Sequence, residues 1–206
     1  MITVEKLSKS YGRVAALTEV SLTIQKGETV GILGPSGSGK TTLLRLLAGF
    51  EQPTYGNISI DDELASSPVY VLEPSLRDIS AVFQTPALWP NMTVIENIEY
   101  VQPNPQTGLF KRVGLWELLD RYPNELSGGE ARRVSIVRAL MAEKSYLLLD
   151  EPLVNLNPEL KTVLHEIIVE ETKRRGLGVL YISHDASELE YADKRYMMSE
   201  GKIGEE

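Results

Sequence analysis

The chain has 206 residues, which is enough for one well-buried domain and too few for two of full size. Hydrophobic residues make up 42% and charged residues 24% of the sequence, a composition that excludes a disordered or low-complexity chain. The net charge of −8 removes any general attraction for nucleic acid, so we expect no nucleic-acid partner. The absence of cysteine excludes disulfides and thiolate metal sites. Because the chain has only two histidines, we do not expect a zinc centre either.

Apolar runs are short throughout the chain. Tyr146–Leu149 is an example, and it falls far below the roughly 20 residues that span a bilayer. The first six residues alternate between apolar and polar, as a strand does, and have no signal-peptide pattern. We therefore expect a chain that remains inside the cell and does not itself cross a membrane.

The N-terminal third reads as short strands followed by a helix. Strands are expected over 2–7, 20–24, 29–33 and 57–61, with turn signals between them that indicate an antiparallel beginning. A helix is expected from Gly39 to Gly49, and it should be buried because leucines cover most of its faces, at Leu43, Leu44, Leu46 and Leu47. A further strand is expected over 79–83.

The middle of the chain differs in composition. Five prolines between residues 86 and 124 indicate a small, loop-rich subdomain with short periodic stretches over 94–100 and 109–119. A helix opened by Ser127 is expected to bury one face and to hold its arginines mostly off that face. The face comprises Ala131, Val134, Val137 and Met141, and the arginines are Arg132, Arg133 and Arg138.

The last third alternates strand, helix and strand. The strands are expected over 146–149 and 179–182, and the helix runs from Asn157 to Gly176 with its apolar residues at helical spacing. The predicted fold is α/β, with a mostly parallel core sheet, an antiparallel N-terminal β part and an inserted small helical subdomain. We expect one domain over 1–206, with 1–85 and 141–206 as the core and 86–140 as the helical subdomain.

A glycine-rich loop follows the strand over 29–33 and opens the first helix. It fits the P-loop pattern of glycine, four residues, glycine, lysine and a hydroxyl residue: Gly34, Pro35, Ser36, Gly37, Ser38, Gly39, Lys40 and Thr41, followed by Thr42. The glycines let backbone amides converge on phosphate oxygens, and the helix N-terminus adds a positive dipole. Lys40 is expected to reach the outer phosphates and Thr41 to ligate magnesium. The loop thus predicts a P-loop nucleotide-binding fold in which the nucleotide is bound together with Mg²⁺.

Two later strands end in residues that a nucleotide hydrolase needs. The strand over 146–149 leads into Asp150 and Glu151, where the first carboxylate can hold magnesium and the second can polarise the attacking water. The strand over 179–182 leads into His184, whose imidazole can reach the γ-phosphate or orient that water. Such sites form beyond the carboxyl ends of parallel strands. His165, within a helix, has no such context and is expected to be structural.

A short motif precedes the helix that begins after Ser127. Leu126-Ser127-Gly128-Gly129-Glu130 can be explained in part as a capping box, in which Ser127 and Glu130 satisfy the first amides of the helix. That reading leaves the glycine pair unexplained, since each glycine costs about 1 kcal/mol of helix stability relative to alanine. Together with Lys40, Gln84, Asp150-Glu151 and His184, in this order, the motif resembles the ABC-type ATPases over nearly the whole chain.

The resemblance implies further roles. The signature Ser127, Gly128, Gly129 and Glu130 would face the γ-phosphate held by a partner subunit, so that two sites form at a dimer interface. Tyr11 resembles the aromatic residue that stacks on adenine, the alternative being an ordinary tyrosine of the turn. Gln84 resembles the glutamine that contacts magnesium and reports the nucleotide state, the alternative being a solvated loop residue. The segment 87–94 resembles the region that receives a helix of the membrane partner, and Trp89 within it is either an interface anchor or a core residue.

Two positions depart from the usual pattern of the family. Glu130 stands in place of a glutamine, which places a negative charge near the γ-phosphate unless the capping box holds it away. The segment Val154-Asn155-Leu156-Asn157 lacks a hydroxyl and a carboxylate that couple the two sites. A heterodimer with a related subunit is therefore an alternative to the homodimer that we expect first.

The expected function is an ATP-hydrolysing subunit that powers transport by separate integral membrane permease subunits, at the cytoplasmic face of the cell membrane. The stretch from Arg77 to Asn97 resembles subunits of small-solute uptake systems, and export is the second transport reading. A soluble ABC-type switch is the main alternative, but only 42 residues separate Gln84 from Ser127, too few for a long coiled-coil arm. A subunit that binds nucleotide without turnover is a third reading. The transported substrate is not encoded in any of these residues.

Overall fold

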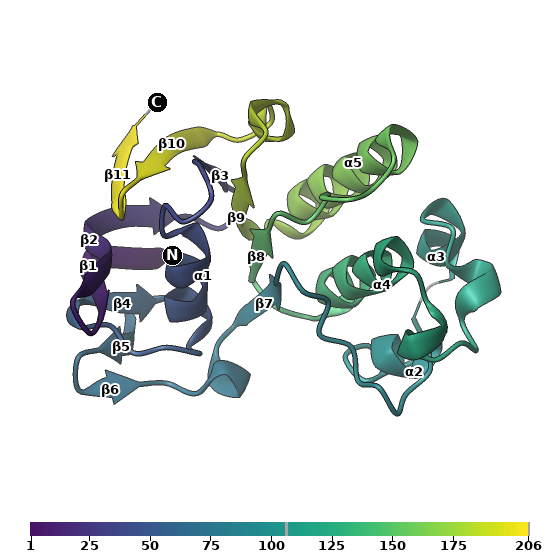
Figure 1. Cartoon of the computed structure of the whole chain (residues 1–206). Coiled ribbons are helices and arrows are strands. Elements are labelled where there is room, and N and C mark those ends of the chain that lie inside the picture. The colour runs from purple at the N-terminus through teal and green to yellow at the C-terminus, as the bar shows by residue number, and fades with distance from the viewer. Residues whose placement is uncertain (106, 206) are drawn as a thin grey trace.

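The computed structural model describes residues 1–105 and 107–205, which form two β-sheets and a set of helices (Figure 1). The first sheet is antiparallel and has the strand order β2-β1-β4-β5-β6. Its strands are β1 (Ile2–Tyr11), β2 (Val14–Ile24), β4 (Tyr55–Ile60), β5 (Glu63–Ser67) and β6 (Tyr70–Val71). This sheet is the antiparallel N-terminal β part that the sequence predicts.

The second sheet is parallel except at one edge, and its strand order is β11-β10-β3-β9-β8-β7. Its strands are β3 (Thr29–Leu33), β7 (Ile79–Val82), β8 (Tyr146–Asp150), β9 (Gly178–Ser183), β10 (Lys194–Ser199) and β11 (Lys202–Glu205). Every residue of β8 and β9 is buried, as expected for parallel strands covered on both faces. The mostly parallel core sheet is therefore confirmed.

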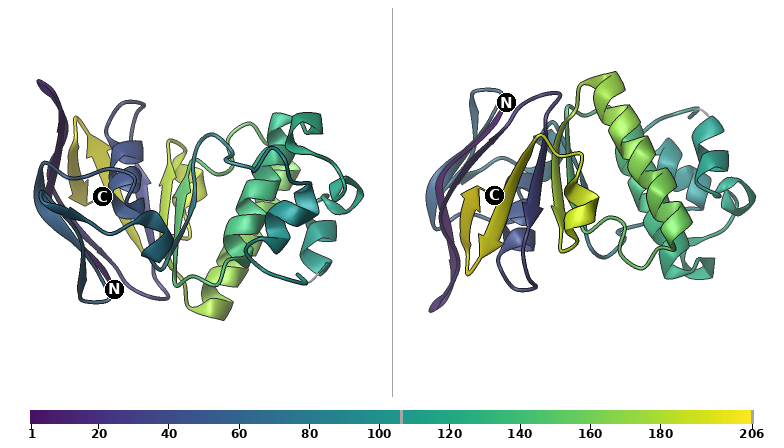
Figure 2. Two further views of the ribbon diagram at one scale, coloured as in Figure 1. Left: turned by 90° about the horizontal axis from the view of Figure 1, so that it is seen from below. Right: turned by 90° about the horizontal axis from the view of Figure 1, so that it is seen from above.

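Helix α1 (Lys40–Ala48) lies between the two sheets, as the views of Figure 2 show. Its leucines are fully buried in a core that also holds residues of both sheets, such as Ile2 and Leu148. The helix ends at Gly49, which adopts the left-handed conformation with a φ of 84° and donates its N–H to the helix carbonyls. The predicted helix and its burial are both confirmed.

A second apolar core joins the other face of the parallel sheet to the remaining helices. These helices are α2 (Val94–Glu99), α3 (Gly108–Arg112), α4 (Gly128–Met141) and α5 (Pro158–Arg175), with short 3₁₀ turns at Pro74–Leu76, Trp116–Leu118, Pro123–Glu125 and Ala186–Leu189. Figure 1 places α2, α3 and α4 on the side away from the antiparallel sheet. The inserted helical part is thus present, while the domain boundaries at residues 85 and 140 stay a prediction. Within the described residues, no helix is long and apolar enough to cross a membrane.

The predicted face of α4 is partly wrong. Arg132 is only 4% exposed, whereas Ala131 and Met141 are half-buried, and Ile136 and Leu140 belong to the core. Arg132 is buried because its guanidinium donates to the backbone carbonyls of Phe83 and Gln84. Hydrogen bonding to main-chain oxygens lets a charged side chain occupy a position that polarity alone assigns to the surface.

Four strands lie outside the sequence prediction, namely β5, β6, β10 and β11. The turn of the β10–β11 hairpin is hydrogen-bonded to the glycine-rich loop. Gly201 at its turn donates its N–H to the Ser38 carbonyl at 2.9 Å and accepts from the Thr18 N–H at 2.8 Å. The hairpin therefore joins the loop to β2 of the other sheet.

Candidate functional site

The loop from Gly34 to Gly39 connects β3 to α1 and depends on its glycines. Gly37 and Gly39 have φ values of 79° and 110°, which side chains rarely adopt. A Cβ on Gly39 would lie 2.6 Å from the Ala16 carbonyl oxygen, and one on Gly34 would lie 2.2 Å from the Met198 carbonyl oxygen. The buried Ser38 hydroxyl has no hydrogen-bond partner among the described residues. The loop is thus a tightly packed stretch of backbone in which the Ser38 hydroxyl still lacks a hydrogen-bond partner.

Lys40 is turned into this loop and is only 5% exposed. Its Nζ donates to the carbonyl oxygens of Gly34 at 2.6 Å and of Pro35 at 2.9 Å. Burial lowers the pKa of Lys40, against the opposing effect of the nearby charges of Glu151 and Asp150. The ammonium therefore lies inside the loop and close to both acids.

Thr41 and Asp150 meet, although they come from different elements. The Thr41 Oγ1, in the first turn of α1, donates to the Asp150 Oδ2 at the end of β8, at 2.9 Å. Asp150 is 2% exposed, and burial raises its pKa although the hydrogen bond from Thr41 opposes the shift. Two oxygen ligands of the kind that Mg²⁺ prefers are thus adjacent at the mouth of the loop.

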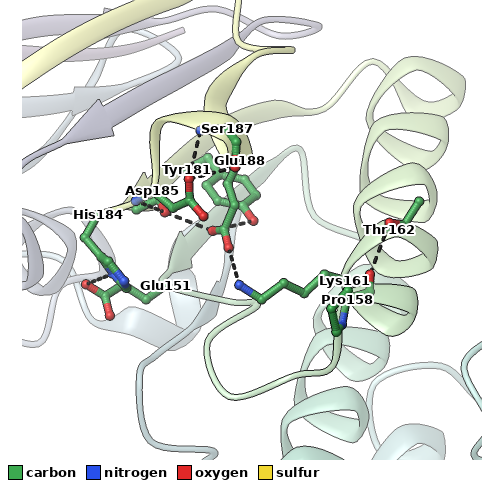
Figure 3. A network of polar contacts seen from close by, with 10 residues as sticks. Glu151, Pro158, Lys161, Thr162, Tyr181, His184, Asp185, Ser187 and Glu188 are labelled. Carbon is green, nitrogen blue, oxygen red and sulfur yellow. Dashed lines mark hydrogen bonds and ion pairs between the residues drawn. The ribbon is translucent and has the colours of Figure 1, made fainter.

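Glu151 and His184 meet at the ends of β8 and β9, which are neighbouring parallel strands. The His184 Nδ1 lies 3.3 Å from the Glu151 Oε1, and the two side chains face each other in Figure 3. The N–H of Glu151 donates to the Ile182 carbonyl at 2.9 Å, and its φ of 48° is unusual for a side chain with a Cβ. The backbone geometry therefore aims this carboxylate away from the strand and toward the histidine.

A cavity of about 210 Å³ opens in front of the loop. Its lining includes Lys40, Thr41, Gln84 and Glu151. The rest of the lining is Ala16, Ser36, Gly37, Gly39 and Thr42. The structure thus brings together, around one hollow, side chains that the sequence places far apart. Asp150 joins this group through Thr41, and His184 joins it through Glu151.

Gln84 follows β7 and keeps an exposed side chain at the rim of the cavity. Its carbonyl is held by Arg132 of α4. Sequence reasoning missed this arginine, because helical periodicity contains no signal for a guanidinium that binds a backbone. The contact links the glutamine to the helix that begins at the signature motif.

Tyr11 is 47% exposed at the end of β1. Its hydroxyl donates to Glu51, and the Lys9 ammonium lies 5.0 Å from the centre of its ring. Burial, followed by the contact with Glu51, raises its pKa, while a hydrogen bond with Thr42 opposes the shift. Tyr11 is therefore next to the loop, and its role toward adenine stays a prediction.

The signature residues form the expected capping box at the start of α4. The Ser127 N–H donates to the Glu130 carboxylate at 2.7 Å, and the Glu130 N–H donates to the Ser127 Oγ at 3.3 Å. Hydrogen bonds from the Ser127 hydroxyl and N–H lower the pKa of Glu130. The Glu130 carboxylate is thus held at the start of its own helix by the capping box, as expected if the box keeps this charge away from the γ-phosphate. Ser127–Glu130 do not line the 210 Å³ cavity, so one copy of the chain does not bring them to the loop.

The segment from Val154 to Asn157 lies beside the signature. A Cβ on Gly129 would lie 3.4 Å from the Leu156 side chain. Asn157 caps α5, since its Oδ1 accepts from the Leu160 N–H at 2.8 Å and Pro158 follows it. The predicted cap is confirmed, and the segment connects Glu151 directly to α5.

Trp89 is half-buried, so its exposure lies between that of an exposed interface anchor and that of a core residue, the two alternatives left open by the sequence. Its ring lies 4.4 Å from that of Tyr100, and the Arg138 guanidinium lies 4.5 Å from its centre. His165 is half-buried against Tyr191, with ring centres 4.8 Å apart. Neither side chain lines the cavity at the loop.

The strand, glycine-rich loop and helix, with an acid at the end of a nearby parallel strand, define a P-loop nucleoside triphosphatase fold. The family model described as ABC transporter matches residues 17–154. The chain therefore belongs to the ABC transporter family.

Comparison with individual proteins agrees with this assignment. The chain is 40% identical to the Fe(3+) ions import ATP-binding protein FbpC of Rhizobium etli, over 99% of this chain and 60% of that protein. It is 39% identical to the glucose import ATP-binding protein GlcV of Saccharolobus solfataricus, over 98% of this chain and 61% of that protein. The chain thus spans about 60% of the length of the curated relatives that it matches.

Solved structures give the same result for the fold. A dimeric, post-hydrolysis structure of the ATP-binding cassette MJ0796 bound to ADP and Pi superposes with a TM-score of 0.86 at 27% identity. The match covers 100% of this chain and 98% of that one.

Proposed function

We propose that this chain is the ATP-binding and ATP-hydrolysing part of a transporter whose membrane-spanning subunits are separate chains. The observation that carries the proposal is the convergence of Lys40, Thr41 and Glu151 on one hollow in front of a glycine-rich loop, with Asp150 hydrogen-bonded to Thr41. These four groups supply the charge, the metal ligands and the base that hydrolysis of a nucleoside triphosphate requires.

The proposed nucleotide site is the loop over Gly34–Thr42. Backbone amides and the start of α1 would bind the phosphates, and Lys40 would exchange its loop carbonyls for phosphate oxygens. Tyr11 would pack against the base. Thr41, Asp150 and Gln84 would hold Mg²⁺, and the 2.9 Å separation of the first two fits a shared hard cation. The metal ion, when bound, neutralises charge on the transferred phosphoryl group.

In the proposed hydrolysis, the Glu151 carboxylate orients the attacking water and accepts its proton. His184 lies beside it, so that its ring can contact the γ-phosphate and keep the carboxylate in place. Lys40 stabilises negative charge on the leaving groups. Asp150 stays close to Lys40 and Thr41 and completes the charge balance.

The complete site is proposed to require two chains. Ser127, Gly128, Gly129 and Glu130 lie outside the cavity of their own chain, and a partner's signature would close over the bound nucleotide. The solved relative MJ0796 is a dimer, which supports this arrangement. A homodimer is the first expectation, and a heterodimer with a related subunit would supply the groups that Val154–Asn157 lack.

Import is the proposed direction of transport, because relatives at about 40% identity are named import ATP-binding proteins. The proposed partners are integral membrane permease subunits, which place the chain at the cytoplasmic face of the membrane. The segment 87–94 with Trp89 is the proposed docking region. The named cargoes of the two relatives are chemically different, namely iron(III) and glucose. The cargo is therefore proposed to be selected by the membrane subunits.

Substitution of Glu151 tests the hydrolytic part of the proposal. Wild-type chain with ATP and Mg²⁺ is expected to release phosphate, whereas Glu151→Gln should bind ATP and accumulate as a dimer by light scattering. A soluble Glu151→Gln monomer at saturating ATP, or phosphate release equal to wild type, would contradict the scheme.

A pull-down tests the transport part. Tagged chain is purified from gently solubilised host membranes, and the proteins that accompany it are identified by mass spectrometry. A polytopic protein in stoichiometric amount is the expected result. Recovery with ribosomal proteins or nucleic acid instead would favour a soluble switch, and an exporter-type partner would reverse the proposed direction.

A further inference from the structure

Glu188 lies in the 3₁₀ turn Ala186–Leu189, which follows His184 along the chain, and its two carboxylate oxygens face different elements (Figure 3). Its Oε2 accepts from the Ser183 hydroxyl at 2.9 Å and from the Tyr181 hydroxyl at 3.5 Å, both on β9. Its Oε1 accepts from the Lys161 Nζ of α5 at 3.2 Å. The side chain is 11% exposed, so one nearly buried carboxylate joins the strand to the helix.

The contact with Ser183 controls the backbone on both sides of His184. Ser183 is 1% exposed, and its hydroxyl also accepts from the Asp185 N–H at 3.0 Å. The residues before and after the histidine are therefore tied to a single buried hydroxyl, which is itself oriented by Glu188. His184 stands between these two fixed points, with its Nδ1 3.3 Å from Glu151.

The contact with Lys161 connects Glu188 to the start of helix α5. Lys161 lies in the first turns of α5, and its N–H donates to the carbonyl of Asn157, the residue that caps the helix. Asn157 ends the segment that runs from Glu151 past the signature motif. A displacement of that segment would therefore move the start of α5, to which Glu188 is joined by its ion pair with Lys161.

We propose that Glu188 is a positioning residue for His184, and that its ion pair with Lys161 ties the position of this histidine to the start of α5. The inference rests on the proposed function, because it concerns the same hydrolytic site. It assigns to Lys161 and Glu188 a connection between His184 and the Val154–Asn157 segment, which lacks two groups that usually connect the sites of this family.

Histidine NMR tests the positioning directly and requires no turnover. The chain has two histidines, so ¹⁵N-histidine labelling gives two ring systems, and a His165→Gln sample assigns them. Glu188→Gln keeps the shape of the side chain but removes its charge. The His184 Nδ1 resonance is expected to move, with a change in the ring tautomer, as its contact with Glu151 loosens. The His165 ring also lies within reach of the Glu188 charge, so only the His184 resonances serve as the readout.

Lys161→Met is the second variant, because it removes the ion pair and leaves the Glu188–Ser183 contact in place. It is expected to move the same His184 resonance in the same direction. Glu190→Gln is the matched control: it removes an exposed carboxylate two residues away and should leave the resonance at its wild-type position. Unchanged His184 resonances in both Glu188→Gln and Lys161→Met, or an equal change in Glu190→Gln, would overturn the proposal.

Kinetics distinguish positioning from loss of fold. Glu188→Gln is expected to lower kcat for phosphate release about tenfold while KM for ATP stays within about twofold, since the loop is untouched. The double variant should be no slower than Glu188→Gln alone, because both changes break one connection. A matching rise in KM, or additive effects of the two changes, would contradict the proposal. If the wild-type chain releases no phosphate while Glu188→Gln and Lys161→Met still move the His184 resonance, the proposed function is overturned and the positioning role is supported.

Discussion

Replacing Arg77 with methionine is expected to be one of the most destabilising single changes in the molecule. Arg77 is 1% exposed and sits where the end of α1, β5 and the start of β7 meet. Its guanidinium donates to four carbonyl oxygens and one hydroxyl at 2.7 to 3.2 Å: Leu46, Leu47, Ala65, Leu72 and Ser66. Burial lowers the pKa of Arg77 to about 10, so the group stays charged at neutral pH.

The cost follows from the acceptors that the change leaves behind. The Leu46 and Ala65 carbonyls also receive backbone donors, from Gly49 and Leu72, and they keep those partners. The remaining acceptors lose a charged donor, and a buried unsatisfied group costs about 1–3 kcal/mol. We expect Arg77→Met to lower the free energy of unfolding by about 4 kcal/mol, toward the lower end of the summed cost for the three acceptors that lose this donor. For a domain of this size that corresponds to a fall in Tm of roughly 8–16 °C.

Urea unfolding monitored by circular dichroism and by tryptophan fluorescence measures this cost. Arg77→Lys should be intermediate, because an ammonium keeps the charge but cannot reach all five acceptors. Arg112→Met is the control, since Arg112 is exposed and pairs with an exposed Glu170, and its midpoint should stay near wild type. A loss below about 1 kcal/mol for Arg77→Met at an unchanged m-value would refute the reasoning from unsatisfied acceptors.

Three further changes test other parts of the structure. Lys40→Met should weaken ATP binding roughly 10- to 100-fold by calorimetry, as expected for a lost charge-assisted contact, and wild-type affinity would remove the lysine from the site. Asn157→Ala should destabilise the chain by about 1 kcal/mol and Asn157→Gly by only a few tenths, so equal losses would argue against the cap. Burial lowers the pKa of His165 below the 6.5 of a free histidine, although a hydrogen bond to the Glu188 backbone opposes the shift. The unfolded chain therefore takes up the proton first, and stability falls as the pH drops below 6.5 toward the folded pKa. His165→Gln should reduce that loss in urea titrations between pH 8 and 5, and parallel pH profiles of the two proteins would contradict it.

The sequence predicts the elements around the loop well because their signals are local. The β3 strand, the glycine-rich loop and α1 are each marked by apolar runs and glycines, and the Asn157 cap is marked by the proline after it. The β10–β11 hairpin was missed although a signal exists. Tyr196 and Met198 alternate with exposed residues, and the turn at Glu200-Gly201 has positive φ at both positions.

Other features depend on contacts that no local pattern encodes. Arg132 lies on what periodicity reads as a polar face, and only the positions of the Phe83 and Gln84 carbonyls explain its burial. Glu188 looks like any acid in a polar turn until β9 and α5 place Ser183 and Lys161 on either side of it. The meeting of Thr41 with Asp150 required the sheet order, although each residue was identified from its own motif.

The support of the glycine-rich loop by late segments has a consequence for the order in which the site can form during synthesis. The strand that precedes the loop, β3, finds its neighbours on both sides only in β9 and β10, more than 140 residues later in the chain. Gly201 then fixes the Ser38 carbonyl. A nascent chain that has emerged only as far as β8 therefore carries the complete glycine-rich motif without either neighbour of its strand. Nucleotide should stabilise the chain only after synthesis has passed the hairpin, so ATP can assist only folding steps that come after the hairpin has emerged.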